Sequence, residues 1–249
     1  MVAHRPVGDA VHWPVPADDV ARAIQYLRAR ASQWNIDPKR IALKGRSSGG
    51  HVALMVGFGP DPAKRNSDDE IERQLSRPTC VLAGSAPTDL AQQMGELLRG
   101  PERQDYLWER MRSLVGAGKD PLTVEELVQR LKPLSPIEIV TKDAPPVLLM
   151  HPGPADAFWP GDARLKWDVR TPITGLILAK KLQELGVPHE LLMLPEGQGG
   201  RGLPSDQEMV FLRRYLGLTV DSRAAPERPR AARGVETSPS PRRPPTRDA

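Results

Sequence analysis

Apolar residues near the start of the chain recur at the spacing of a helix. Asp18 and Asp19 favour a helix start there, because acidic side chains interact well with a helix N-terminus. The apolar positions that follow are three or four residues apart, on one helix face: Val20, Ala23, Ile24, Leu27, Ala31 and Trp34. The pattern ends at the proline-containing run Asn35-Ile36-Asp37-Pro38. It predicts a helix over residues 17–34 with one buried face.

Four short apolar runs have the composition of buried parallel strands. They are residues 40–44, 79–85, 146–151 and 190–194. Each is continuous rather than alternating, which is typical of a strand covered on both faces. The first leads into Gly45, after which residues 51–58 can be helical, and the last two enclose a predicted helix over 173–185. The order predicts an α/β fold with a mostly parallel, doubly wound sheet.

A capping pattern predicts the last helix. The run Ser205-Asp206-Gln207-Glu208 has the spacing of a capping box, in which the first and fourth residues each satisfy the other's backbone N–H. We expect the helix to bury Val210, Phe211 and Leu216 and to stop at Gly217.

A second capping pattern lies in a stretch with little other regularity. Residues 87–143 are polar and interrupted by glycine and proline, and within them Thr123 and Glu126 have the same capping-box spacing. We expect this stretch to be helical in pieces. It can form a cap or lid over a site.

The positive charge of the chain is concentrated at its end. Residues 221–249 hold seven arginines against four acids, a net of +3 out of the total of +4. Residues 220–249 also contain six prolines and almost no large apolar side chain, so they cannot offset the entropy cost of ordering. We predict one folded domain over 1–218 and a disordered tail over 219–249. The nearly neutral body gives no indication of a nucleic-acid face, although the tail alternatively offers a weak contact for acidic partners or RNA.

Cysteine content and hydropathy exclude several classes of protein. Cys80 is the only cysteine, which excludes an internal disulfide and a cysteine-based zinc cluster. No run approaches the roughly 20 apolar residues of a membrane-spanning helix, and none of signal-peptide length follows the N-terminus. We expect a soluble, cytoplasmic protein with no membrane contact. The sequence leaves the oligomeric state open.

One sequence motif indicates a candidate catalytic serine. Gly45-Arg46-Ser47-Ser48-Gly49 has the pattern of a nucleophile elbow, a strained turn that raises a serine hydroxyl above the edge of a sheet. The predicted strand before it and helix after it supply the context that this turn needs. The alternative is a glycine-rich strand-to-helix turn without chemistry.

Several further short motifs lie before and after the elbow. They include Ala86-Pro87-Thr88-Asp89-Leu90 and Leu134-Ser135-Pro136-Ile137, and the other segments are residues 16–19, 22–24, 35–41, 45–51, 144–151, 185–191 and 194–195. Together, across about residues 2–217, they resemble bacterial α/β-hydrolases of the esterase/lipase type, including the feruloyl-esterase-like and hormone-sensitive-lipase-like groups. The resemblance implies the α/β-hydrolase fold.

The resemblance also implies the roles of particular residues. Ser47 corresponds to the nucleophile, and the backbone N–H of Ser48 to one oxyanion-hole donor. Asp156 lies where the acid of the catalytic triad is expected, with Asp162 and Asp168 as weaker candidates. A serine hydroxyl needs a histidine to accept its proton and an acid to orient that histidine. Alternatively, Asp156 is a solvated loop carboxylate.

The chain departs from the pattern of these hydrolases in two places. The turn in which they carry the catalytic histidine is residues 194–201 here, where Gln198 or Gly199 takes its position, and no histidine follows His189. Their first strands and their His-Gly-Gly oxyanion loop would precede Met1. The resemblance therefore implies a fold without its N-terminal strands and a site without its usual base.

Two of the five histidines are candidates for a substitute base. His51 is one helical turn beyond Ser47, although a helix residue there is more often structural. His151 ends a predicted strand at the correct edge of the sheet, as a neighbour of the site or as a turn-forming residue. The others read as ordinary surface or strand-end residues: His4, His12 and His189. Trp159 either lines an acyl pocket or covers the core.

Two functions therefore stay open at the level of sequence. The first is a serine hydrolase of carboxylic esters, which transfers an acyl group through Ser47 to water and needs neither a metal nor an organic cofactor. Its partner would be a small ester substrate. The second is a catalytically inactive α/β-hydrolase remnant that uses the same pocket to bind an acyl ligand, or that contacts another protein.

Overall fold

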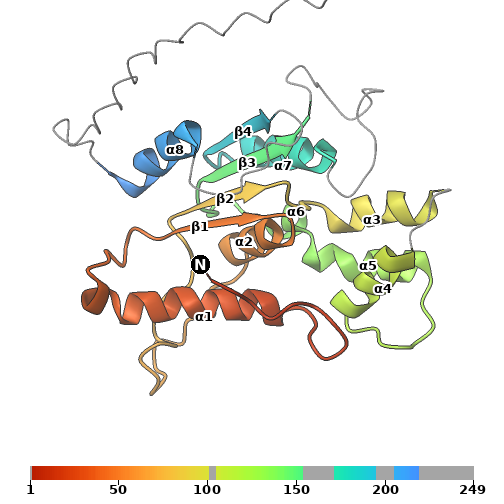
Figure 1. Ribbon diagram of the computed structural model, residues 1–249, viewed down its shortest axis with the longest axis horizontal. Helices are drawn as coiled ribbons and strands as arrows, with labels where there is room; N and C mark the ends of the chain where they lie inside the picture. The colour runs from red at the N-terminus through yellow and green to blue at the C-terminus, as the bar shows by residue number, and fades with distance from the viewer. Residues whose placement is uncertain (1, 101–104, 154–170, 195–204, 219–249) are drawn as a thin grey trace, which may run out of the picture. The chain divides into compact units, whose positions relative to one another are not determined.

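Parallel strands form the centre of the fold (Figure 1). The computed structural model describes residues 2–100, 105–153, 171–194 and 205–218. Within them the sheet consists of β1 (Ala42–Arg46), β2 (Cys80–Gly84), β3 (Val147–Pro152) and β4 (His189–Leu194). The strands lie in sequence order, each paired in parallel with the next. The predicted α/β fold is confirmed, and each strand lies within two residues of its predicted bounds.

Helices cover both faces of this sheet. The helices that do so, directly or through another helix, are α1 (Val15–Ala29), α2 (Ser48–Phe58), α7 (Ile173–Glu184) and α8 (Asp206–Leu216). Successive strand residues point to opposite faces. Val81 and Leu149 therefore pack on the side of α2 and α7, whereas Leu82 and Leu148 pack on the side of Phe211 in α8. Helix α1 packs against α2, so the predicted doubly wound arrangement is present.

The segment 87–143 is helical in pieces, as predicted, and forms an apolar cluster of its own. Its helices are α3 (Leu90–Arg99), α4 (Asp105–Leu114), α5 (Val124–Leu131), a 3₁₀ turn (Lys132–Leu134) and α6 (Pro136–Ile139). Buried leucines and methionines of α3, α4 and α5 pack together beside the sheet layer (Figure 1). The predicted capping box is present, with Thr123 and Glu126 each accepting the other's backbone N–H.

Two helix predictions were wrong in detail. Trp34 is 46% exposed, because α1 ends at Ala29 and Ala31–Trp34 is a 3₁₀ turn whose different pitch carries the indole off the buried face. Val210 is 51% exposed although Phe211 beside it is fully buried. Neighbouring residues in a helix point about 100° apart, and the buried face of α8 covers Phe211 but not Val210. Gly217 ends α8 at φ 61° as predicted.

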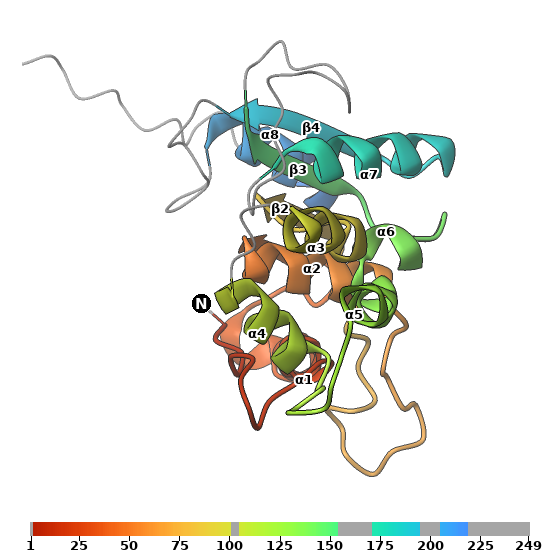
Figure 2. The same cartoon turned by 90° about the vertical axis from the view of Figure 1, so that its right-hand side faces the viewer.

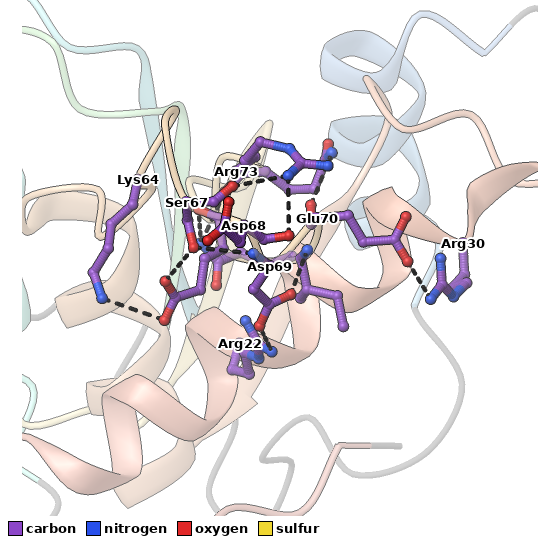
Figure 3. Close-up of polar contacts among 12 residues, drawn as sticks. Arg22, Arg30, Lys64, Ser67, Asp68, Asp69, Glu70 and Arg73 are labelled. Atoms are coloured by element: carbon purple, nitrogen blue, oxygen red, sulfur yellow. Dashed lines mark hydrogen bonds and ion pairs between the residues drawn. The ribbon is translucent and has the colours of Figure 1, made fainter.

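A long polar loop joins α2 to β2 and is fixed to α1 by charged side chains (Figure 3). Arg22 of α1 pairs with Asp69 of the loop at 2.5 Å, and Arg30 pairs with Glu70. These side chains are partly exposed, and such pairs contribute roughly 0–1 kcal/mol each. The loop is held at the surface, on the far side of α1 from the sheet.

Some predictions fall on residues outside those described. These are the tail at 219–249, the loop that carries Asp156 and the turn at 195–201. No helix in the described ranges combines the length and apolar character needed to cross a membrane.

Candidate functional site

Ser47 occupies a strained turn between β1 and α2. Its backbone has φ 52° and ψ −125°, outside the regions that a non-glycine residue ordinarily adopts. Its N–H donates to the carbonyl oxygen of Gly84 at 2.7 Å, which ties the turn to the end of β2. The side chain is exposed. A turn of this kind costs about 1–3 kcal/mol, which the surrounding contacts must offset.

Glycines allow the backbone to come close to itself around this turn. A Cβ atom on Gly45 would lie 2.1 Å from the carbonyl oxygen of Gly49, and one on Gly50 would lie 2.9 Å from the Cβ of Ala86. A Cβ on Gly49 would meet nothing within 4 Å. Glycine is therefore sterically required at positions 45 and 50. It is not required at Gly49, the last residue of the five-residue motif.

Ser48 is the first residue of α2. The helix supplies no acceptor for the N–H groups of its first turn, and its dipole places partial positive charge there. The Ser48 N–H is thus available for an oxygen that develops negative charge beside Ser47. Its role as an oxyanion donor stays a prediction from the resemblance.

A cavity of about 420 Å³ opens beside Ser47. One wall is the elbow and the first turn of α2, with Ser47, Ser48 and His51. Residues of α3 and α4 supply the opposite wall, and the N-terminal segment adds His4, Pro6 and Val7. In Figure 2 the ribbons of α3 and α4 lie in front of α2 and α1, with the N-terminal segment beside α4. The apolar residues of the lining include Trp13, Val52, Leu90, Met94, Leu107, Met111 and Leu114. Part of the segment 87–143 therefore faces the serine.

His51 has a structural role in this arrangement. Its side chain is 5% exposed, and its Nε2 lies 2.7 Å from the carbonyl oxygen of Leu134, to which it donates. The ring also packs against that of Trp13, with centroids 5.5 Å apart. Burial lowers the pKa of His51 to about 4, so the imidazole is neutral at physiological pH. With Nε2 engaged, His51 joins α2 to the 3₁₀ turn Lys132–Leu134, which follows α5.

His151 is buried beneath the sheet edge rather than in the cavity lining. It is 1% exposed, and burial lowers its pKa to about 4. Its ring packs on the first turn of α7, where a Cβ on Gly175 would lie 2.3 Å from Nε2. Within the described part of the chain neither ring nitrogen has a hydrogen-bond partner. His151 therefore does not reach Ser47 through the cavity.

His4 lines the cavity, which the sequence alone did not indicate. The adjacent Arg5 makes a two-pronged contact with Asp19 of α1, with its Nη2 2.6 Å from Oδ1 and its backbone N–H 2.8 Å from Oδ2. This contact fixes the N-terminal segment beside the elbow. The Nδ1 of His4 lies 3.0 Å from the Arg5 carbonyl oxygen. Arg5 and Asp19 are 14 residues apart, so no short sequence pattern predicted that they would pair.

Two motifs of the resemblance meet behind the α3 wall. Asp89 caps α3 by accepting the Gln92 N–H at 3.0 Å, and burial raises the pKa of this carboxyl despite that bond. Ser135 accepts the Ala91 N–H at 3.0 Å through its Oγ. Both side chains therefore hold the start of α3, and α3 lines the cavity beside the elbow.

Other predicted site residues fall outside the described ranges. Asp156, Trp159, Asp162 and Asp168 are among them, so the predicted acid stays a prediction. Among the residues that the structure does describe, no three His, Cys, Asp or Glu side chains lie close enough together to hold a metal ion.

Solved structures share this architecture, and a curated relative matches part of the sequence. A structure of an acetyl ester-xyloside bifunctional hydrolase from Caldicellulosiruptor lactoaceticus is 28% identical with a TM-score of 0.57, covering 84% of this chain and 64% of that one. A truncated carbohydrate esterase from gut microbiota is 27% identical with a TM-score of 0.56, covering 78% and 64%. The probable carboxylic ester hydrolase LipM of Mycobacterium tuberculosis is 28% identical over 140 residues, 56% of this chain and 30% of LipM.

The matches also show how much of each relative this chain spans. The chain spans about two thirds of the length of those solved structures and about a third of LipM. The BD-FAE family matches residues 1–162, which include the elbow, the cavity wall on α3 and α4, and β3. The chain therefore belongs to the BD-FAE family of α/β-hydrolase esterases.

Proposed function

We propose that this chain hydrolyses carboxylic esters through Ser47. The observation that carries the proposal is the strained backbone of Ser47, which holds an exposed hydroxyl beside a cavity of about 420 Å³. Strain at a non-glycine residue persists where surrounding contacts enforce it, and such positions concentrate at active sites. The esterase relatives support the same reaction class.

In the proposed reaction the Ser47 oxygen attacks the ester carbonyl carbon and its proton passes to water, because neither His51 nor His151 is placed to accept it. Negative charge that develops on the carbonyl oxygen is stabilised by the Ser48 N–H and the N-terminus of α2. The alcohol leaves with a proton, and water then releases the acid from the acyl-enzyme. We assign the orienting acid to Asp156, on the resemblance described above.

A second candidate function is ligand binding without turnover. It is favoured by the sequence, because no histidine occurs between His189 and Ala249, where esterases of this type carry their base. His51 does not replace that base, since its Nε2 is engaged by Leu134 and burial keeps its pKa near 4. Loss of a triad member lowers catalysis by several orders of magnitude.

An ester assay with matched serine variants separates the two functions. We expect slow release of p-nitrophenol from p-nitrophenyl acetate by the full chain, and no release above background by Ser47→Ala. Ser48→Ala is the control: it removes a neighbouring hydroxyl but keeps the backbone N–H, so it retains the activity. Equal rates for wild type and Ser47→Ala would exclude Ser47 as the nucleophile and favour the binding function.

A further inference from the structure

The cavity beside Ser47 has an uneven distribution of charge. Within the described ranges its lining includes no aspartate or glutamate and one arginine or lysine, Arg110 of α4. The N-terminus of α2 adds partial positive charge at the opposite wall. Most other lining residues are apolar. Among the described lining residues the cavity therefore has positive charge at two places and no acidic side chain beside it.

Arg110 is an exposed arginine that lines the cavity and, within the described residues, makes no hydrogen bond and no ion pair. It shares this property in this segment with Arg130, which lies outside the lining. Arg112, two positions on, is buried, donates to the Gly118 and Asp120 carbonyl oxygens at 2.6 and 2.8 Å, and lies over the Trp108 ring. Arg99 of α3 pairs with Glu125 at 3.2 Å. The charge of Arg110 is thus left for a ligand.

We infer that Arg110 makes this cavity selective for esters whose acyl group ends in a carboxylate, such as monoesters of dicarboxylic acids. An arginine offers a planar pair of donors that matches a carboxylate. The ester carbonyl would lie at Ser47 on the elbow wall and the carboxylate at Arg110 on the α4 wall. The methylene groups between them would contact Leu107 and Met111. The substrate part of this inference rests on the proposed hydrolase function, whereas the preference for anions does not.

Helix α4 presents Arg110 and Tyr106 toward the cavity from the same face, since they are four residues apart. Tyr106 is 60% exposed and carries a hydroxyl, so this end of the cavity is polar and open to solvent. A ligand carboxylate at Arg110 would therefore stay partly hydrated. The cost of desolvating the pair is small in such a position, and the interaction gives selectivity rather than a large gain in affinity.

The test begins with binding, because binding does not require turnover. Titrations of 5-phenylvalerate and of 5-phenylpentanol are followed by calorimetry and by intrinsic tryptophan fluorescence, to which Trp13 of the cavity lining contributes. We expect the full chain to bind the carboxylate about tenfold more tightly than the alcohol, and Arg110→Gln to bind the two equally. The control is Arg130→Gln, which removes the same charge from an exposed position on α5 outside the lining. It should keep the tenfold preference.

Turnover then tests the substrate class. The rate ratio for mono-p-nitrophenyl glutarate over p-nitrophenyl valerate should fall about tenfold in Arg110→Gln and stay unchanged in Arg130→Gln. An unchanged binding preference in Arg110→Gln, or no binding of either ligand, would overturn the inference. Preferential binding of the carboxylate with no turnover of either ester would remove the hydrolase function and leave the anion site in place.

Discussion

The two walls of the cavity are built by different means. The elbow wall is fixed by backbone contacts: Gly45 passes so close to Gly49 that no side chain fits, and Ser47 is bonded to the end of β2. The α3–α4 wall is made of apolar side chains on helices, with Arg110 as its charged member. Backbone geometry leaves the first wall little freedom, whereas side chains on the second can change without altering the fold. Reaction chemistry belongs to the first wall in this account and selectivity to the second.

Acid should lower the free energy of unfolding more than any single substitution considered below, because two buried histidines must be protonated. Burial lowers the pKa values of His51 and His151 to about 4, so the unfolded chain binds more protons than the folded one between about pH 6.5 and 4. Stability is therefore unaffected above about pH 6.5 and falls as the pH is lowered. Together the two groups should reduce the free energy of unfolding by about 4 kcal/mol at pH 5.

Urea denaturation at a series of pH values measures this slope. His51→Leu should show about half of the loss that the wild-type chain shows between pH 6.5 and 5, because one of the two titrating groups is gone. A wild-type stability that is flat over this range would contradict the buried, neutral state of both histidines.

Gly45→Ala should have the largest effect of the substitutions in the elbow wall. The new Cβ would lie 2.1 Å from the Gly49 carbonyl oxygen, so the turn must shift. We expect a loss of about 3 kcal/mol in the free energy of unfolding, the upper range for overpacking. Urea denaturation measures it, and any activity that depends on Ser47 should be lost with it.

Gly49→Ala is the matched control for that substitution. Its Cβ would meet no atom within 4 Å, and alanine favours a helix over glycine by about 1 kcal/mol. This variant should be as stable as the wild type or slightly more stable. Equal losses in the two variants would show that the motif is not held by the contact at Gly45.

His51→Leu, measured at pH 8 where the imidazole is neutral in both states, tests the link between α2 and the 3₁₀ turn after α5. It removes the bond to the Leu134 carbonyl oxygen and leaves that buried acceptor unpaired. The expected cost is about 2 kcal/mol, and α5 with the 3₁₀ turn after it should exchange backbone amide protons faster. A loss of stability without faster exchange in α5 would place the effect in α2 alone.

The sequence predicted the elbow wall well, because its signals are local. The apolar run of β1, the glycine at position 45 and the serine after it are adjacent, and the structure confirms the strand, turn and helix in that order. The helices of the other wall were predicted only as pieces. Their contacts with Ser47 join residues far apart in the chain, and a four-residue apolar spacing on α4 does not reveal what it faces. His4 was missed for the same reason.

Ion pairs of the surface loop should have the smallest effect. Asp69→Asn breaks the pair with Arg22 between the loop and α1, at exposures where such pairs contribute roughly 0–1 kcal/mol. We expect a change in the free energy of unfolding below about 1 kcal/mol and no change in ligand binding. A loss comparable to that of Gly45→Ala would show that the loop supports the elbow through α1.

The most direct test of the account is where an electrophile attaches to the folded chain. A fluorophosphonate reacts with an activated serine, and tryptic peptide mapping by mass spectrometry identifies the modified residue. The account predicts one adduct on Ser47, none on Ser48, and none in Ser47→Ala or in urea-unfolded wild type. An adduct on another serine, or the same slow labelling in folded and unfolded chain, would contradict the assignment of Ser47 as the nucleophile.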